Sequence, residues 1–386
     1  MNMKKNLFMV AAVALMAMVS CNKEEINNSG SEQASDIVFV AEFDHEADTK
    51  IALGDLVDGV RKTTWVAGDE IKINGTVFSA KAAGERTEFT TTESFAGAAT
   101  YRAVYPASSF ISTAAVDIPS TQNGTFASAS IAVAESSTTS LKFNNLVTIL
   151  KFQVPVNCSK VTFESTASIA DRITVRYTDG VMKPDYAGVT NGSKTINVDG
   201  TFVPKTDYYV AVKPGTHTFT VKIDGYVSKK STKSVTVERS QILNMGILPE
   251  PEKYTWGLVG QHQGWDITNP TPMYKVADNV YAALGITLQA DGFKFAKTGL
   301  KNWNDSNTYF GAWKKSDNQN YFNFSSEMST ASWYGVYTNN LGGQSENIGV
   351  NDFSKKYDIY VKVLQKANWG DELGYTIVEA GTSVQI

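Results

Sequence analysis

Cysteine and histidine are scarce in this chain of 386 residues. Only Cys21 and Cys158, and only His45, His217 and His262, are present. No two of these residues stand at the spacing of zinc ligands, and two cysteines allow at most one intrachain disulfide. The sequence therefore predicts no metal site, and we expect no cofactor.

Helical periodicity and an excess of basic charge are also missing. No long stretch repeats apolar residues at helical spacing, whereas Thr, Ser, Val, Tyr and Phe are abundant, which favours an all-β chain. The formal net charge is −4, so no basic surface for nucleic acid is expected. Hydrophobic residues make up 42% and charged residues 19% of the chain, which is ordinary for globular domains and argues against large-scale disorder.

The N-terminus carries a short leader. Lys4 and Lys5 precede an apolar run over residues 7–19 that is too short to span a bilayer comfortably, so residues 1–20 are expected to be a secretory signal peptide. The Met-Val-Ser-Cys sequence at residues 18–21 resembles a bacterial lipobox, which implies acylation of Cys21. An ordinary signal peptide with an incidental cysteine is the alternative. If Cys21 is acylated, Cys158 has no partner for an intrachain disulfide.

The residues that directly follow Cys21 indicate where the protein is located. The Asn-Lys-Glu-Glu sequence at residues 22–25 resembles the surface-export signal of Bacteroidetes lipoproteins, which implies an outer-membrane lipoprotein displayed on the cell surface. The periplasmic leaflet is the alternative. Residues 21–35 are expected to be a flexible tether, because residues 26–35 are rich in Asn, Ser, Gly and Glu.

Alternating apolar residues begin after the tether. Ile37, Phe39, Ala41 and Phe43 are spaced to share one face of a strand. Asn74-Gly75 lies between two short alternating segments, 70–73 and 76–79, and predicts a β-hairpin, since both turn residues tolerate positive φ.

Residues 36–248 resemble the fimbrillin-like proteins of Bacteroidetes. The likeness lies in segments 49–51, 65–71, 103–108, 118–122 and 141–152, which occur in the family's order. It implies two β-sandwiches, at residues 36–154 and 155–248. Pilus-forming members of that family assemble by strand exchange, but here another whole domain follows Leu248. This departure favours a stalk that does not polymerise, or at most a terminal subunit. Simple β spacers with no assembly role are the alternative to pilus building.

The last third of the chain holds most of the tryptophan. A short linker at residues 249–252 precedes a domain at residues 253–386, which has the size of one immunoglobulin-like sandwich. Trp256 and the rings of Phe293 and Phe295 are expected in its core, with Lys294 facing outward.

Polar loops surround two of these tryptophans. Trp265 lies among Gln263, Gly264 and Asp266, and Trp303 lies between two asparagines, which favours surface positions for both rings. Sugar rings pack their C–H faces on aromatic rings, and their hydroxyls need polar partners.

The C-terminal domain resembles the starch-binding modules of SusE/SusF-type outer-membrane lipoproteins. The likeness lies in segments 256–260, 264–267 and 293–295, followed by Trp303. It implies an aromatic platform for a sugar chain, with Trp265 and Trp303 at matching positions and Lys294 in a matching motif. We add Trp313, Asp266 and Asn304 as neighbouring candidates.

These patterns predict a non-catalytic, lipid-anchored protein that binds a polysaccharide or oligosaccharide, in particular an α-glucan, beside other glycan-uptake proteins of the outer membrane. A glycosidase needs two carboxyl groups across a cleft. Acids are present in this domain, among them Asp266, Asp305, Glu327 and Glu346, but no pair stands in a recognisable catalytic arrangement, and no hydrolase motif occurs. The alternative is a cell-surface adhesin or fimbrial tip component that binds a protein.

Overall fold

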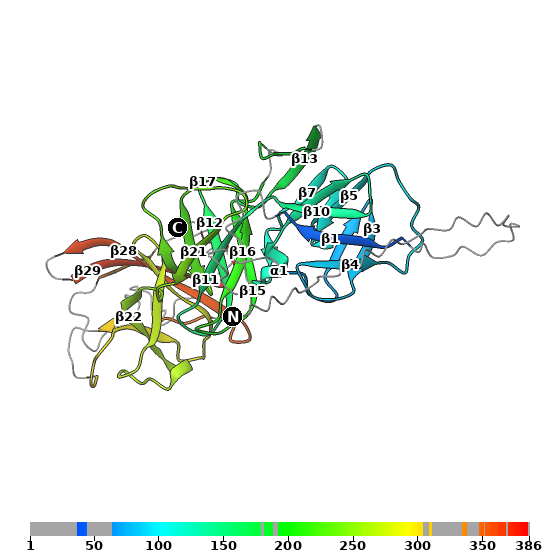
Figure 1. Cartoon of the computed structure of the whole chain (residues 1–386). Helices are drawn as coiled ribbons and strands as arrows, with labels where there is room; N and C mark the ends of the chain where they lie inside the picture. The colour runs from blue at the N-terminus through cyan, green and yellow to red at the C-terminus, as the bar shows by residue number, and fades with distance from the viewer. Residues whose placement is uncertain are drawn as a thin grey trace, which may run out of the picture.

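The computed structural model describes residues 37–44, 64–178, 181–187, 192–303, 309–310, 334–337, 347–350, 352–367 and 370–384. In this part of the chain strands dominate, and the one α-helix, α1 (Phe126–Ala129), is four residues long. The all-β prediction is therefore confirmed. Figure 1 shows three β units in a row, in chain order from blue to red. None of the helices in the described ranges has the length and apolar character that crossing a bilayer requires.

The first unit is a closed barrel rather than the predicted sandwich. One edge of β1 pairs in parallel with β10 and the other pairs antiparallel with β4, so the sheet closes on itself and leaves no open edge. Alternation along β1 showed which residues face the core, but it carries no information about which strands pair. In barrel order the strands are β1 (Phe39–Phe43), β10 (Ser140–Asn145), β9 (Ala132–Ser136), β5 (Tyr101–Tyr105), β2 (Glu70–Ile73), β3 (Thr76–Ala80) and β4 (Arg86–Thr90).

Aromatic rings fill the barrel. Phe39, Ala41 and Phe43 are all buried, as their alternation predicts. The Trp65 ring stacks on Phe43 with ring centroids 4.4 Å apart, and its Nε1 donates a hydrogen bond to the backbone oxygen of Ala41 at 2.9 Å. The predicted hairpin is confirmed, because β2 and β3 pair across Asn74 and Gly75, whose φ angles are 47° and 100°.

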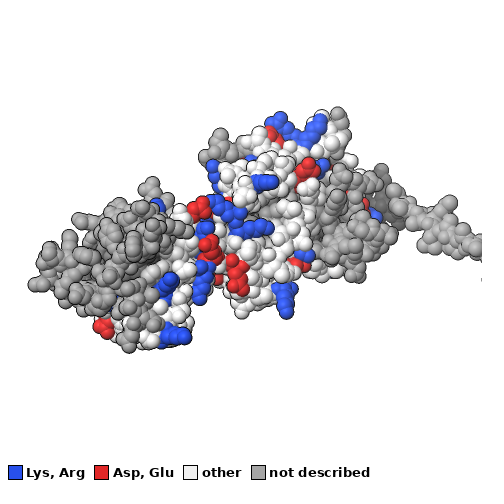
Figure 2. Space-filling view, turned by 90° about the vertical axis from the view of Figure 1, so that its left-hand side faces the viewer, with Lys and Arg blue, Asp and Glu red and all other residues white. Residues whose placement is uncertain are grey.

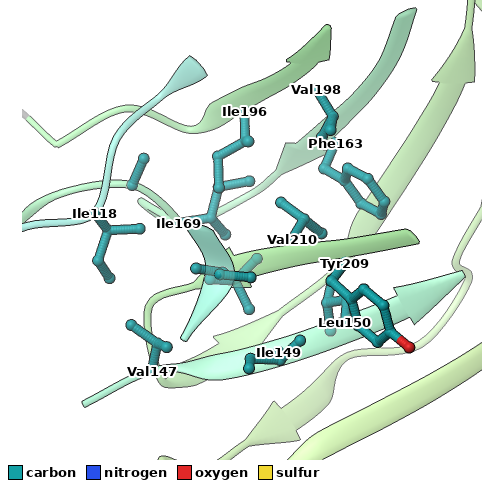
Figure 3. Close-up of a cluster of buried hydrophobic side chains, with 14 of the residues drawn as sticks. Ile118, Val147, Ile149, Leu150, Phe163, Ile169, Ile196, Val198, Tyr209 and Val210 are labelled. Atoms are coloured by element: carbon teal, nitrogen blue, oxygen red, sulfur yellow. The ribbon is translucent and has the colours of Figure 1, made fainter. Parts of the chain in front are cut away.

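The second unit contains strands from both sides of the boundary that was expected between residues 154 and 155. β7 pairs with β13 and β8 with β15, so the segment after β5 leaves the barrel and joins the next unit. Figure 3 shows Ile118 and Val147 in the same core as Phe163 and Ile196. The remaining strands form sheets in the orders β16-β11-β21, β19-β18-β12-β15-β8, β14-β13-β7-β6 and β17-β20. The elements are η1 (Ala107–Ser109), β6 (Phe110–Ser112), β7 (Ala115–Asp117), β8 (Thr121–Gln122), β11 (Thr148–Gln153), β12 (Cys158–Ser165), β13 (Arg172–Thr178), β14 (Val181–Asp185), β15 (Thr195–Phe202), β16 (Tyr208–Val212), β17 (Gly215–His217), β18 (Phe219–Ile223), β19 (Tyr226–Lys230), β20 (Val235–Val237) and β21 (Ile242–Ile247).

The C-terminal unit is one eight-stranded sheet in the described residues, where two packed sheets were expected. Phe295 in β25 and Tyr375 in β29 lie near opposite ends of this sheet, yet their ring centroids are 5.8 Å apart, so the sheet curls around its own core. In sheet order the strands are β26 (Tyr309–Phe310), β25 (Phe293–Lys297), β22 (Lys253–Gly260), β23 (Thr271–Ala277), β24 (Val280–Thr287), β28 (Lys356–Ala367), β29 (Gly370–Glu379) and β27 (Tyr334–Tyr337).

The core of this unit contains the residues that the sequence assigned to it. Trp256, Phe293 and Phe295 are buried in one cluster on the inner face of the sheet, which confirms their predicted burial. On the molecular face shown in Figure 2, lysine, arginine and acidic side chains are interspersed where they are coloured, and no large field of one sign is visible.

Candidate functional site

The loop between β22 and β23 holds Trp265 in an unusual backbone conformation. η2 (Gln261–Gln263) ends at Gly264, and both Gly264 (φ 76°) and Trp265 (φ 59°) have positive φ. The left-handed region is uncommon for a bulky residue and costs roughly 1–2 kcal/mol. A hydrogen bond from the Trp265 amide to the Gly260 oxygen, 2.9 Å long, closes the turn.

Side-chain amides and carboxylates brace this loop. The side-chain oxygen of Gln263 accepts a hydrogen bond from the Asp266 backbone amide at 2.7 Å, and its Nε2 donates to the backbone oxygen of Asp266 at 2.8 Å. Asp266 Oδ1 accepts from the Thr268 hydroxyl at 2.6 Å and from the Thr268 amide at 2.9 Å. These hydrogen bonds, that of the hydroxyl first, lower the pKa of the exposed Asp266 carboxyl. The loop is therefore held in one shape with a charged carboxylate on its surface.

The fold brings Trp265 and Trp303 together. Their ring centroids are 6.1 Å apart and their planes meet at 55°. Both rings are half-buried, and they pack on a small apolar cluster of Val259, Ile267 and Ala296. Each ring therefore keeps a water-accessible part, and the two tilted planes form an aromatic corner on the outer face of the sheet.

Lys294 lies on the same face of the sheet as this aromatic corner. It stands directly opposite Val259 in the β22–β25 pairing, and directly opposite residues of a pair project to one side. The rings of Phe293 and Phe295 project to the other side. Lys294 is half-buried. The position is compatible with the predicted role, which stays a prediction.

Several predicted residues lie outside the described part of the chain. These are Cys21, Asn304 and Trp313, together with the acids Asp305, Glu327 and Glu346. Among the residues that are described, no group of three His, Cys, Asp or Glu side chains is arranged to hold a metal ion.

Gln263 and Thr268 are the loop residues whose roles the sequence did not reveal. Gln263 joins Asp266 to Asn269 by hydrogen bonds, and Thr268 saturates one carboxylate oxygen of Asp266. Their positions in the sequence could have indicated these roles. Gln263 stands three residues before Asp266 and Thr268 two residues after it, and side chains at these offsets commonly form hydrogen bonds within a turn.

No protein-family model and no curated protein matched this chain. Among solved structures, the chain is similar to a protein from Bacteroides ovatus that is provisionally described as a cell adhesion protein. The two share 12% sequence identity with a TM-score of 0.33, over 55% of this chain and 92% of that chain. Similarity at this level carries no argument about fold or function.

Proposed function

We propose that this protein is a non-catalytic glycan-binding protein, anchored in the outer membrane by a lipid on Cys21 and displayed on the cell surface. The observation that carries the proposal is the aromatic corner of Trp265 and Trp303, whose rings stand 6.1 Å apart on the outer face of the C-terminal sheet. Two tilted rings offer stacking surfaces to the C–H faces of sugar units.

The surroundings of the corner supply polar groups for sugar hydroxyls. Asp266 is exposed beside Trp265, its Oδ1 is saturated by Thr268, and Lys294 shares the face of the two rings. A few placed polar groups beside apolar stacking surfaces are the usual composition of a ligand site. An α-glucan is the ligand class that the resemblance to starch-binding modules favours.

A glycan array probed with the mature chain tests this function. We expect binding to at least one polysaccharide, with α-glucans such as starch or pullulan first. Binding to no glycan on the array would contradict the proposal and favour the adhesin alternative, in which the C-terminal unit takes a protein partner.

Lipid anchoring has its own test. Replacing Cys21 by alanine removes the sulfur that is acylated, so the variant should be released from membranes, whereas the wild-type chain fractionates with them. Replacing Cys158 by alanine is the matched control and should leave the membrane fraction unchanged. A Cys21→Ala variant that still fractionates fully with the outer membrane would mean that another element anchors the chain.

A further inference from the structure

A cavity of about 180 Å³ lies where the second unit meets the C-terminal sheet. β19 contacts β23 at this junction, and the ring centroids of Tyr226 and Tyr274 lie 4.9 Å apart. The Tyr226 hydroxyl accepts a hydrogen bond from the Leu284 amide at 3.1 Å, which ties the two units together. The cavity is thus built by both units and bounded by two tyrosine rings.

The rest of the cavity wall is largely aliphatic. Val156, Ile223 and Pro251 line it beside the tyrosines. Sites for drug-sized molecules measure roughly 300–1,000 Å³, so a space of about 180 Å³ suits a group the size of one side chain.

Two carboxylates, Asp224 and Glu250, also line the cavity, and no lysine or arginine does. Asp224 Oδ1 is fixed by three donors, the Ser159 amide, the Ser159 hydroxyl and the Lys160 amide, each at 3.0 Å. Within the described part of the chain, Asp224 Oδ2 has no hydrogen-bond partner and neither acid has an ion-pair partner.

A second cavity along β19 differs from the tyrosine-lined cavity, because its acids are paired with lysines. Glu164 and Asp278 line it, and each is neutralised by a lysine in the same wall, Glu164 by Lys222 at 2.7 Å and Asp278 by Lys230 at 2.6 Å. The tyrosine-lined cavity lacks such lysines, so its two acids leave it with negative charge.

We propose that the tyrosine-lined cavity binds an alkylammonium group, the chemistry of a lysine side chain. A cation near aromatic faces is attracted by the ring quadrupole, and the attraction grows where water is excluded. The two carboxylates supply the opposite charge, and the aliphatic wall covers a methylene stem. A neutral ligand in the same place would desolvate the carboxylates without pairing them.

Calorimetric titration of the mature chain tests this site with three probes. Nα-acetyl-lysine amide should bind saturably, and Nα-acetyl-norleucine amide, which has a similar apolar stem and no charge, should bind at least about ten-fold more weakly. Choline separates the sources of the ammonium group. Tighter binding of choline indicates a quaternary amine such as a headgroup, and tighter binding of the lysine amide indicates a peptide side chain.

Variants locate the binding. Tyr274→Leu should weaken the lysine amide by about three-fold or more through loss of the ring face. Glu250→Gln should weaken binding of the lysine amide and make that binding less dependent on salt concentration. Glu252→Gln is the matched control, because Glu252 lies in the same linker but contacts Lys275 and Tyr281 outside the cavity. It should leave the affinity unchanged.

Two results would overturn the inference. One is equal affinity for the norleucine and lysine amides, since the carboxylates would then play no part. The other is the absence of saturable lysine amide binding by a wild-type protein that shows a normal melting transition. Neither result bears on the glycan proposal, whose residues lie in the loop after β22, in β25 and in the segment that follows β25.

Discussion

At the scale of single residues, the informative position is Trp265. Its φ of 59° lies in a region that glycine or asparagine would occupy with less strain. Strained residues of this kind persist where the surrounding structure over-determines them, and they concentrate at binding sites. Here the hydrogen bonds of Gln263 and Asp266 brace the loop, and the strained backbone holds the indole ring beside Trp303.

A buried ion pair in the second unit gives a prediction at the same scale. Lys213 Nζ lies 2.8 Å from Asp171 Oδ2, and the two side chains are 13% and 3% exposed. Lys213→Met would leave the Asp171 carboxylate buried without its cation, which typically costs 3–5 kcal/mol. We expect about 3 kcal/mol here, measured by urea unfolding, because Asp171 lines a cavity of about 340 Å³ that admits water.

The control for that prediction is the pair of Lys81 and Glu88 on the barrel. Its atoms lie 3.0 Å apart, but both side chains are about half exposed. Lys81→Met should therefore change the free energy of unfolding by less than about 1 kcal/mol. Equal losses in the two variants would show that the Asp171–Lys213 pair is solvated in solution.

At the scale of elements, the β2–β3 hairpin depends on one backbone angle. Gly75 has a φ of 100°, and a Cβ at this position would meet no atom within 4 Å. Gly75→Ala should therefore lower the free energy of unfolding by about 1 kcal/mol through backbone strain alone. The measurement is thermal melting of the Gly75→Ala variant, with a Gly97→Ala variant melted under the same conditions as the control. Gly97 is not among the positive-φ glycines, and its added methyl would make ordinary contacts from 3.6 Å, so that variant should melt within error of wild type.

Elements also show what a sequence pattern can and cannot specify. Alternation placed Phe39, Phe293 and Phe295 in cores, and Asn74-Gly75 predicted a hairpin, because both signals are local. The partner of β1 is not local, since Val40 pairs with Ser140, and no pattern in either strand encodes that choice. The barrel and the transfer of β7 and β8 to the second unit were therefore outside the reach of the sequence.

The candidate site divides in the same way. Polar loops around Trp265 and Trp303 predicted surface rings, and the structure makes them half-buried neighbours. Their proximity could not be read from the sequence, because 38 positions separate them and the register of β22 with β25 decides their distance.

At the scale of the molecule, the second and third units form a joined body. Tyr226 packs against the C-terminal cluster of Val276, Ala282 and Tyr360, and its hydroxyl bonds to Leu284. This contact holds the C-terminal sheet, and with it the aromatic corner, against the second unit.

Calorimetric melting tests this coupling. Tyr226→Ala removes both the ring and the hydrogen bond, so the second and third units should melt in separate transitions, whereas the wild-type units should melt together. Lys230→Met is the control, because it removes only the exposed ion pair with Asp278 and should leave the transitions joined. Joined transitions in Tyr226→Ala would mean that other contacts couple the units.

The central claim is that Trp265 and Trp303 form a glycan platform. Each ring that acts as a binding hot spot costs on the order of 1–3 kcal/mol when removed, so the double alanine variant should lose retention on starch or on whichever glycan the array identifies. The double variant is needed because multivalent retention on a polymer can mask the loss of one ring.

The measurement is glycan affinity and thermal melting on the same preparations of three proteins: wild type, the double Trp265→Ala/Trp303→Ala variant and Trp256→Phe. Trp256 belongs to the inner core of the same sheet, so its replacement should lower the melting temperature and leave glycan affinity unchanged. The double variant should lose glycan binding. Its loss of stability should be smaller than that caused by removing two fully buried rings, because Trp265 and Trp303 are half-buried in the wild type. Undiminished glycan binding by a folded double variant would contradict the account.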